Sequence, residues 1–202
     1  MPADPPAPDS TVVARELADA LESRGIEYAL GGALALNLWA EPRGTIDVDL
    51  SLFLDPGAPT AAVQTVLELG CAARTAEAVA SFLDRGLARF EYRGRRVDVY
   101  LPTLEIYESA RRRRVRAPLH GRPAWFWSAE DITVFKLMFF RPKDLADVES
   151  ILRNRDTSYD LGYVRSWLVR MFGDRDPRVT RFDELARAIP PRSADSRGTP
   201  GT

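Results

Sequence analysis

The chain has 202 residues, of which 45% are hydrophobic, and a formal net charge of −1. This length suits one domain, or a domain with a helical appendage, and supplies enough apolar residues for a buried core. The near-neutral charge gives no global basic field for nucleic acid, and no apolar run approaches the roughly 18 residues that a membrane helix needs. The single cysteine, Cys71, excludes an internal disulfide framework and a cysteine-based zinc cluster.

Both ends of the sequence combine Pro, Ser and charged residues without apolar periodicity. Residues 1–10 and 190–202 are therefore expected to be disordered tails. The first ten residues also lack the basic stretch of a signal peptide, so a reducing cytoplasm is the expected location, without a membrane partner. The single histidine, His120, cannot form a histidine-rich metal site and is expected to be an ordinary surface residue in a turn.

The first half of the sequence contains both the helical and the strand periodicity of apolar residues. Apolar residues three and four positions apart predict helices, and alternation of apolar and polar residues predicts strands. The expected elements are helices over 11–24, 33–40, 59–69 and 76–85, strands over 26–30 and 45–54, and a hairpin of strands 88–92 and 95–101 around Arg93-Gly94.

The second half is predicted to be helical. Thr103 is expected to cap a helix that ends at Arg113, and Ser128 with Asp131 forms a capping box for a helix that ends near Phe140. The fold class expected from this order is α+β, with a small mixed sheet and flanking helices in the first part and a helical subdomain after it. The ranges are 11–127 for the α/β core, 128–189 for the helical subdomain, and 143–153, 159–172 and 178–189 for its later helices.

Two aspartates stand two positions apart in the predicted strand over 45–54. Side chains at i and i+2 share a face of a strand, so Asp47 and Asp49 would be rooted about 7 Å apart, close enough to converge on one or two cations. By itself this pattern fits the solvent face of an amphipathic strand equally well. The residues expected on the polar face are Thr45, Asp47, Asp49 and Ser51, and those expected to face the core are Ile46, Val48, Leu50 and Leu52.

A third aspartate, Asp98, lies between Val97 and Val99 in another predicted strand. If that strand lies beside the first, Asp98 supplies a third carboxylate. Three carboxylates that hold Mg²⁺ (or Mn²⁺) with the phosphates of a nucleoside triphosphate are a standard arrangement for in-line displacement at phosphorus. The competing interpretation is a surface salt bridge of Asp98 to Arg95 or Arg96.

Gly31-Gly32 stands between a predicted strand and the N-terminus of a predicted helix. Backbone amides at such a position are unpaired, and glycine lets a phosphate approach closely. The pair belongs neither to a Walker A loop nor to a dinucleotide-binding G-x-G-x-x-G motif. A lone Gly-Gly is more often a plain turn, but its position before the aspartate strand, with Arg43 between them, favours phosphate binding.

In this order the motifs resemble the nucleotidyltransferase superfamily, whose fold is shared with polymerase beta. Within it, the sequence is most similar to the bacterial group that includes the abortive-infection type IV toxin nucleotidyltransferases. The resemblance covers residues 12–155. It is carried by Gly31-Gly32-Ala33-Leu34-Ala35, Arg43-Gly44-Thr45-Ile46-Asp47-Val48-Asp49, Val97-Asp98-Val99 and a downstream motif that contains Glu130-Asp131-Ile132, Lys136-Leu137 and Arg141-Pro142-Lys143-Asp144-Leu145-Ala146-Asp147.

The resemblance implies a role for each matching residue. Asp47 and Asp49 would bind the metals, and Asp98 would complete the metal site and help to activate the acceptor hydroxyl as a general base. In the wider superfamily the second glycine of the first motif is more often serine, so Gly32 lacks a hydroxyl for the phosphate. The implied nucleotide-binding residues are Gly31, Gly32, Arg43, Thr45, Lys136 and Asp144.

Lys136 and the arginine run over 111–116 each allow two interpretations. A lysine in an apolar helix is costly to bury unless it is paired, so Lys136 is expected to reach the phosphates, to pair with Asp144 or Asp147, or both. The arginines suit a solvated helix end better than the phosphates of an RNA acceptor. The aromatic residues over 125–127 are expected to pack in the core.

The leading hypothesis is an enzyme that transfers a nucleoside monophosphate from a triphosphate such as ATP to a hydroxyl and releases pyrophosphate. The acceptor could be tRNA, as in the toxins, a protein, or a small molecule such as an aminoglycoside, and an antitoxin is a further expected partner. The competing hypothesis is a non-catalytic nucleotide-binding or interaction module. Three retained carboxylates argue against that module, because a degenerate copy has no reason to keep them.

Overall fold

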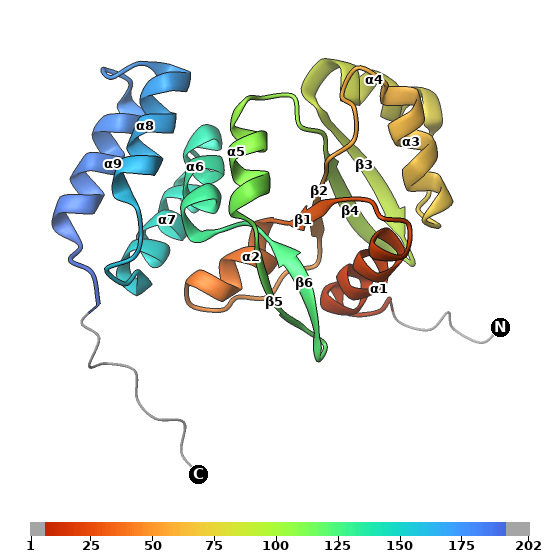
Figure 1. Cartoon of the computed structure of the whole chain (residues 1–202), viewed down its shortest axis with the longest axis horizontal. Coiled ribbons are helices and arrows are strands. Elements are labelled where there is room, and N and C mark those ends of the chain that lie inside the picture. Colours follow the sequence, from red (N-terminus) through yellow and green to blue (C-terminus); the bar gives the residue numbers. More distant parts are fainter. Residues whose placement is uncertain (1–6, 193–202) are drawn as a thin grey trace, which may run out of the picture. The chain divides into compact units, whose positions relative to one another are not determined.

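A computed structural model describes residues 7–192, and contacts divide the chain into two compact units (Figure 1). The first unit contains the residues up to Ala35 and Gly44–Trp127, and the second contains Leu36–Arg43 and the residues from Ser128 onward. The segment Leu36–Arg43 therefore belongs with the helical part. The domain ranges 11–127 and 128–189 stay a prediction.

The expected tails lie mostly outside the described residues, which exclude 1–6 and 193–202. At the N-terminal side, order begins earlier than expected, because the Asp9 carboxylate accepts a hydrogen bond from the Thr11 amide and caps the first helix. The elements of the first unit are α1 (Ser10–Ser23), β1 (Tyr28–Leu30), the start of α2 (Gly32–Trp39), β2 (Val48–Leu52), α3 (Pro59–Glu68), α4 (Thr75–Arg85), β3 (Leu87–Tyr92), β4 (Arg95–Tyr100), α5 (Ile106–Arg113), β5 (Val115–Leu119) and β6 (Arg122–Phe126).

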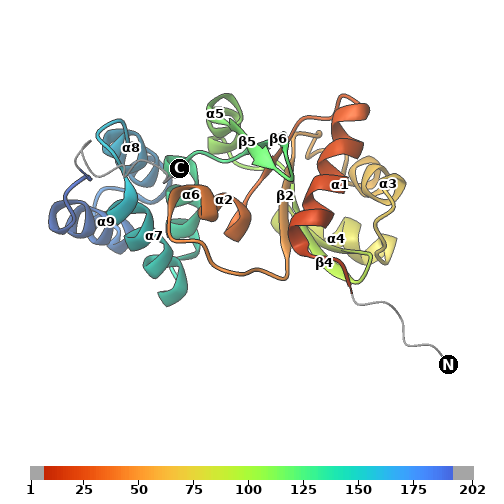
Figure 2. The same cartoon turned by 90° about the horizontal axis from the view of Figure 1, so that it is seen from below.

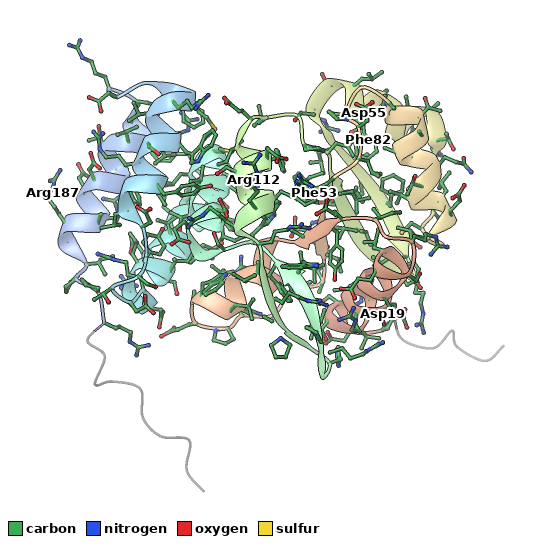
Figure 3. The ribbon with its side chains drawn as sticks, in the orientation of Figure 1. Asp19, Phe53, Asp55, Phe82, Arg112 and Arg187 are labelled. Carbon is green, nitrogen blue, oxygen red and sulfur yellow. The ribbon has the colours of Figure 1, made fainter. Side chains whose placement is uncertain are left out.

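The strands of the first unit form one mixed sheet in the order β3-β4-β2-β1-β6-β5. β2 is antiparallel to β1 and parallel to β4, and β1 is parallel to β6. In Figures 1 and 2, α1, α3 and α4 lie on one side of the sheet and α5 lies on the other. The side chain of Phe82 on α4, labelled in Figure 3, packs against Phe90 of β3 with 6.1 Å between ring centroids. This mixed α+β arrangement confirms the predicted fold class.

Two hairpins with the same turn build the two edges of the sheet. Arg93-Gly94 joins β3 to β4 and His120-Gly121 joins β5 to β6, and in each pair both residues have positive φ, as a type I′ turn requires. The first hairpin was predicted, and the second was missed. Pro118 and Pro123 pair with each other across the second hairpin, and prolines within a segment argue against a strand when only the sequence is known.

Two details of the expected elements are wrong. The strand predicted over 45–54 is limited to β2, so alternation does not extend to Ile46, whose side chain is 69% exposed, whereas Ser51 is buried. Thr103 does not cap α5, which begins at Ile106 with Glu105 at the N-cap. The other expected core positions of β2, Val48, Leu50 and Leu52, are fully buried.

The second unit contains the end of α2 and a group of helices. Ser128 caps α6 through the amide of Asp131, as the capping box predicted. The buried guanidinium of Arg155 donates hydrogen bonds to the carbonyls of Leu152, Ala186 and Ile189, and so satisfies the C-terminal ends of two helices. None of the described helices is long and apolar enough to span a membrane. The helices are α6 (Ala129–Phe139), α7 (Pro142–Asn154), α8 (Leu161–Phe172) and α9 (Pro177–Ala188).

Candidate active site

The predicted neighbour relation between the two aspartate strands is confirmed. β2 and β4 are adjacent and parallel, and their register places Asp49 directly opposite Asp98. Residues opposite each other in neighbouring strands point to the same face, at a strand spacing of about 4.8 Å. The Asp98 side chain is 11% exposed, so its carboxylate lies at the boundary between the core and solvent.

Asp47 lies just before β2, in a segment shaped by Thr45. The Thr45 hydroxyl donates to the Asp47 carbonyl (3.1 Å) and accepts from the Asp47 amide (3.3 Å). The strand alternation predicted for Asp47 therefore does not apply to it, and this local turn sets its position instead. The Asp47 side chain is 24% exposed. In this arrangement the Thr45 hydroxyl is hydrogen-bonded to the backbone of Asp47. The nucleotide contact of Thr45 stays a prediction.

The glycine pair leaves room for Asp49. Gly32 has a φ of +51°, and a Cβ added there would lie 1.8 Å from Oδ2 and 3.0 Å from Cβ of Asp49. A Cβ on Gly31 would lie 3.2 Å from Cδ1 of Trp127, and the Gly31 amide donates to the Asp49 carbonyl (2.9 Å). Both glycines are thus needed for close approach of neighbouring residues, which gives a reason for Gly32 apart from phosphate binding.

Two arginines lie on the carboxylates. Arg96 of β4 forms ion pairs with Asp47 and, at 3.6 Å, with Asp98, and Nε of Arg89 donates to Asp98 Oδ1 at 2.9 Å. The competing salt bridge of Asp98 to Arg96 is therefore present, while Arg95 donates to the Pro8 carbonyl instead. The side chains of Arg89 and Arg96 are 64% and 42% exposed, so these pairs are inexpensive to break.

The oxygen atoms of Asp47, Asp49 and Asp98 are the type of ligand that a divalent cation such as Mg²⁺ binds. Oxygen ligands of this type are those that Mg²⁺ and Mn²⁺ prefer, and Asp49 and Asp98 already share one face of neighbouring strands. In the part of the chain that the structure describes, no three Asp, Glu, His or Cys side chains are gathered closely enough to hold a metal. A cation bound by Asp47 and Asp98 would have to displace Arg96.

Tyr100 is a neighbour that the sequence analysis missed. Its hydroxyl donates to Oδ1 of Asp49 (3.2 Å). Burial, together with the charges of Asp49 and Asp98, raises the pKa of Tyr100 well above its ordinary value of 10.0. The available signal was its spacing, because Tyr100 follows Asp98 by two residues in the same strand and therefore projects from the same face.

The downstream motif forms a compact ion cluster within the second unit. Nζ of Lys136 lies 2.6 Å from Asp147 Oδ2 and 3.5 Å from Asp144 Oδ1. Arg43 contributes a second cation, with Nη2 at 3.0 Å from Asp147 Oδ2, and Arg141 donates to Asp144 through Nε (2.5 Å). The pairing interpretation of Lys136 is therefore borne out with both aspartates. Its contact with phosphates stays a prediction.

Asp144 is the most deeply buried member of this cluster. Its side chain is fully buried, while that of Lys136 is 12% exposed. Burial alone would raise the pKa of Asp144, but the hydrogen bonds from Arg141 and the charge of Lys136 outweigh it, and the pKa lies below its ordinary value. Asp144 therefore keeps its charge in the interior because cations surround it.

Acidic partners neutralise the arginine run. Arg111 and Arg112 pair with Glu108, Arg114 lies 2.6 Å from Glu27, and Arg116 lies 3.4 Å from Glu22. These pairs use positive charge that an RNA backbone would need, and so they favour the interpretation as a solvated surface. The guanidinium of Arg114 also stacks between the rings of Phe53 and Trp125, at 4.8 and 5.0 Å from their centroids. Phe126 and Trp127 are buried, as predicted, while Trp125 is partly exposed.

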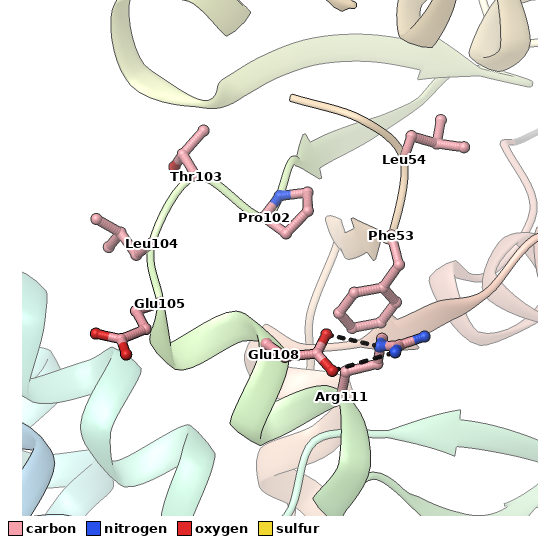
Figure 4. Close-up of a pocket in the computed structure, with 8 residues that line it drawn as sticks. All are labelled: Phe53, Leu54, Pro102, Thr103, Leu104, Glu105, Glu108 and Arg111. Atoms are coloured by element: carbon pink, nitrogen blue, oxygen red, sulfur yellow. Dashed lines mark hydrogen bonds and ion pairs between the residues drawn. The ribbon is translucent and has the colours of Figure 1, made fainter. Parts of the chain in front are cut away.

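A cavity of about 410 Å³ lies beyond the C-terminal ends of β2 and β4 (Figure 4). The ring of Phe53 and the Arg111–Glu108 ion pair face it, with Nε of Arg111 at 3.0 Å from Glu108 Oε2. None of the predicted metal or nucleotide residues lines it. The lining residues are Phe53, Leu54, Pro102, Thr103, Leu104, Glu105, Glu108 and Arg111.

Several solved structures are similar to the chain. An antigenic nucleotidyltransferase-like protein from Paracoccidioides brasiliensis is 18% identical, with a TM-score of 0.50 over 93% of this chain and 96% of that chain. The antibiotic-resistance factor ANT(2'')-Ia is 16% identical (TM-score 0.48; 88% and 89% covered), and the lincosamide antibiotic adenylyltransferase LnuA is 12% identical (TM-score 0.45; 72% and 96% covered). The first of these likenesses shows the shared fold.

The family comparison covers most of the chain. No curated protein matches the sequence. The family model described as "Nucleotidyl transferase AbiEii toxin, Type IV TA system" matches residues 15–195, which include both units and all the motifs named above. The chain therefore belongs to the AbiEii nucleotidyl transferase toxin family of type IV toxin–antitoxin systems, and it is a nucleotidyltransferase enzyme with the fold predicted from its sequence.

Proposed function

We propose that the chain transfers a nucleoside monophosphate from a nucleoside triphosphate to a hydroxyl acceptor, with Mg²⁺ or Mn²⁺ as cofactor and pyrophosphate as the second product. The observation that supports this most is the register of β2 and β4, which puts Asp49 opposite Asp98 while Asp47 stands at the start of β2. Carboxylates on one face of two neighbouring strands suit the binding of a metal–triphosphate complex.

In this proposal Asp47, Asp49 and Asp98 hold the metal, which when bound neutralises the charge of the triphosphate and polarises it. The acceptor oxygen forms a bond to the α-phosphorus, and the bond from the α-phosphorus to the bridging oxygen breaks as pyrophosphate leaves. Asp98 takes the proton of the acceptor hydroxyl. Because Arg89 and Arg96 are substantially exposed, both can turn from the carboxylates towards solvent or substrate.

Nucleotide contacts are proposed for Gly31, Gly32 and Thr45 in the first unit and for Arg43 and Lys136 in the second, and an indirect nucleotide-binding role is proposed for Asp144. Two cations, Arg43 and Lys136, converge on Asp147, and the Arg43 side chain is 47% exposed. A phosphate that bound these cations would compete with Asp147. Asp144 would then act through Lys136, because it is fully buried and cannot itself meet a ligand.

The proposed acceptor is tRNA, and a small-molecule hydroxyl such as that of an aminoglycoside is the alternative. The toxin–antitoxin family supports an antitoxin partner. The tRNA acceptor and action in the cytoplasm are proposed from the resemblance of the sequence motifs to type IV toxins. The neutralised arginine run supplies no support for an RNA surface at that position. The acceptor must therefore be identified by experiment.

The test is label transfer. Each α-³²P nucleoside triphosphate is incubated with the protein, Mg²⁺ and total tRNA, and in parallel with aminoglycosides. Wild-type protein is expected to transfer label and Asp47→Ala/Asp49→Ala to lose transfer, while Asp84→Ala, an exposed aspartate on α4, retains it. Equal labelling by wild type and the double variant, or no transfer to any acceptor, would overturn the proposal.

A further inference from the structure

The Asp49 carboxylate accepts a hydrogen bond from Tyr100 of β4 and lies where only a glycine at position 32 of α2 leaves room for it. We infer that Tyr100 is a positioning residue that fixes the Asp49 carboxylate in the orientation required for the metal–nucleotide complex. This inference rests on the proposed function. It adds to the aspartate motif a residue that carries no charge and that the motif does not contain.

The register of the sheet brings Tyr100 to Asp49. Asp49 pairs with Asp98, and Ser51 pairs with Tyr100, so Tyr100 lies one same-face position further along β4. A long side chain can reach diagonally across neighbouring strands. The Tyr100 hydroxyl does so and donates to Asp49 Oδ1 at 3.2 Å.

The other oxygen of Asp49 occupies the space that Gly32 leaves open. A Cβ on Gly32 would lie 1.8 Å from Oδ2 and 2.5 Å from the carboxyl carbon of Asp49. Oδ1 thus accepts a hydrogen bond from β4, and Oδ2 lies in space that the missing side chain of Gly32 leaves open. The hydrogen bond from Tyr100 therefore favours one rotation of the carboxylate about its bond to Cβ.

A neutral donor suits this role better than a cation. Arg89 and Arg96 also orient a carboxylate, but they cancel its charge and compete with a metal ion for it. The phenol orients Asp49 and leaves its negative charge available.

The test compares Tyr100→Phe with Tyr28→Phe. Tyr28 lies in the same unit and donates a hydrogen bond to the Glu22 carboxylate (2.9 Å), away from the site, so its variant removes an equivalent phenol–carboxylate bond. Binding of Mn²⁺ in the presence of α,β-methylene-ATP is measured by electron paramagnetic resonance. Tyr100→Phe is expected to raise the Kd for Mn²⁺ about tenfold, since a hydrogen bond to a charged group is lost, and Tyr28→Phe to leave it unchanged. An Mn²⁺ Kd within about twofold of wild type in Tyr100→Phe would overturn the inference.

A kinetic and a double-variant measurement separate positioning from loss of stability. Positioning predicts that the Mg²⁺ concentration for half-maximal transfer rises in Tyr100→Phe, with kcat at saturating Mg²⁺ close to wild type. In an Asp49→Asn background, Tyr100→Phe should weaken Mn²⁺ binding no further, because the bond no longer orients a charged ligand. Independent, additive losses contradict the inference.

The outcomes distinguish this inference from the function on which it rests. A wild-type protein that binds Mn²⁺–nucleotide and transfers label, with Tyr100→Phe indistinguishable from it, overturns only the role of Tyr100. A wild-type protein that neither binds Mn²⁺–nucleotide nor transfers label overturns the proposed function and the positioning role with it.

Discussion

The two units each contain a group of aspartates, and the two groups are neutralised in different ways. Of the sheet aspartates (Asp47, Asp49 and Asp98), Asp47 pairs with Arg96 and Asp98 with Arg89, and these arginines are 42% and 64% exposed. The α7 aspartates (Asp144 and Asp147) also pair with exposed arginines, Arg141 and Arg43, but they share in addition Lys136, which is 12% exposed. Asp98 and Asp147 are about equally buried, so the two groups differ in their cations rather than in their carboxylates.

This difference in the cation predicts a difference in the cost of breaking the pairs. An exposed ion pair contributes between about 0 and 1 kcal/mol, so a cation or a substrate can replace an exposed arginine at little cost. Removal of one partner from a buried pair costs about 3–5 kcal/mol, because the remaining charge stays in the interior. The arginines can thus leave the sheet aspartates during a reaction, and Lys136 is expected to stabilise the helical unit through the α7 aspartates whether or not it also meets a phosphate.

The largest effect on stability is expected from Lys136→Met. This change leaves Asp144 and Asp147 short of a buried cation, although Arg141 and Arg43 remain, and should reduce the free energy of unfolding by about 3 kcal/mol. Lys143→Met, the same change at the other lysine of the chain, lies at an exposed position and serves as the matched control. Urea unfolding measures both. Equal stability of the two variants would contradict the structural role of Lys136.

Gly32→Ala is expected to have its main effect on activity, and to reduce the free energy of unfolding less than Lys136→Met does. The new Cβ would displace the Asp49 carboxylate and should lower kcat/KM about 100-fold, or about 2.7 kcal/mol. Gly25→Ala is the control, because Gly25 has a similar positive φ (+67°) and nothing within 4 Å of the added Cβ. Both variants carry the strain of a left-handed alanine, about 1–2 kcal/mol. An equal loss of activity in both would show that strain alone is responsible.

A smaller effect is expected in acid, from the lowered pKa of Asp144. A carboxyl whose pKa is lower in the folded state stabilises the protein above its ordinary value of 3.8, and this contribution is lost as the pH falls through the folded pKa. Asp144→Asn removes this titration, so the variant should lose less stability than wild type between about pH 5 and pH 2. Parallel stability curves for the two proteins in that range would argue against the assignment.

The smallest effect is expected for the reactivity of Cys71, whose thiol is buried. Burial raises the pKa of Cys71 to about 12, so almost none of its thiol is ionised at pH values near neutrality. Folded protein should therefore react very slowly with a thiol reagent such as dithionitrobenzoate, and fully only after unfolding. Rapid reaction of the native protein would contradict the burial of the Cys71 thiol.

The sequence predicted the features that depend on local periodicity and on motif order. Helices at 11–24 and 59–69 and the hairpin around Arg93-Gly94 follow from spacing and turn residues, and their positions differ from the structure by one or two residues. The pairing of β2 with β4 could only be stated as a condition, because a register between strands 49 residues apart is a long-range contact. The structure supplied the register itself.

The features that were not predicted depend on turns and on contacts between strands. The hairpin of β5 and β6 contains two prolines that face each other, so its pattern does not resemble that of a strand. Ile46 was expected in the core, but the turn made by Thr45 ends the alternation before β2 begins. The spacing of Tyr100 from Asp98 indicates the face from which it projects, but not its diagonal contact with Asp49 on another strand.

The most direct test of the central claim is calorimetric titration of the protein with the nucleoside triphosphate that labels best, with and without Mg²⁺, in wild type, Asp49→Asn and Asp55→Asn. Asp55 is exposed, and the described hydrogen bond of its side chain is a local one from the Gly57 amide, so it controls for loss of a negative charge in the first unit. The expected result is binding that requires Mg²⁺, is much weaker in Asp49→Asn and persists in Asp55→Asn. Binding that is indifferent to Mg²⁺, or equal in wild type and Asp49→Asn, would contradict the assignment of the sheet aspartates as the metal site.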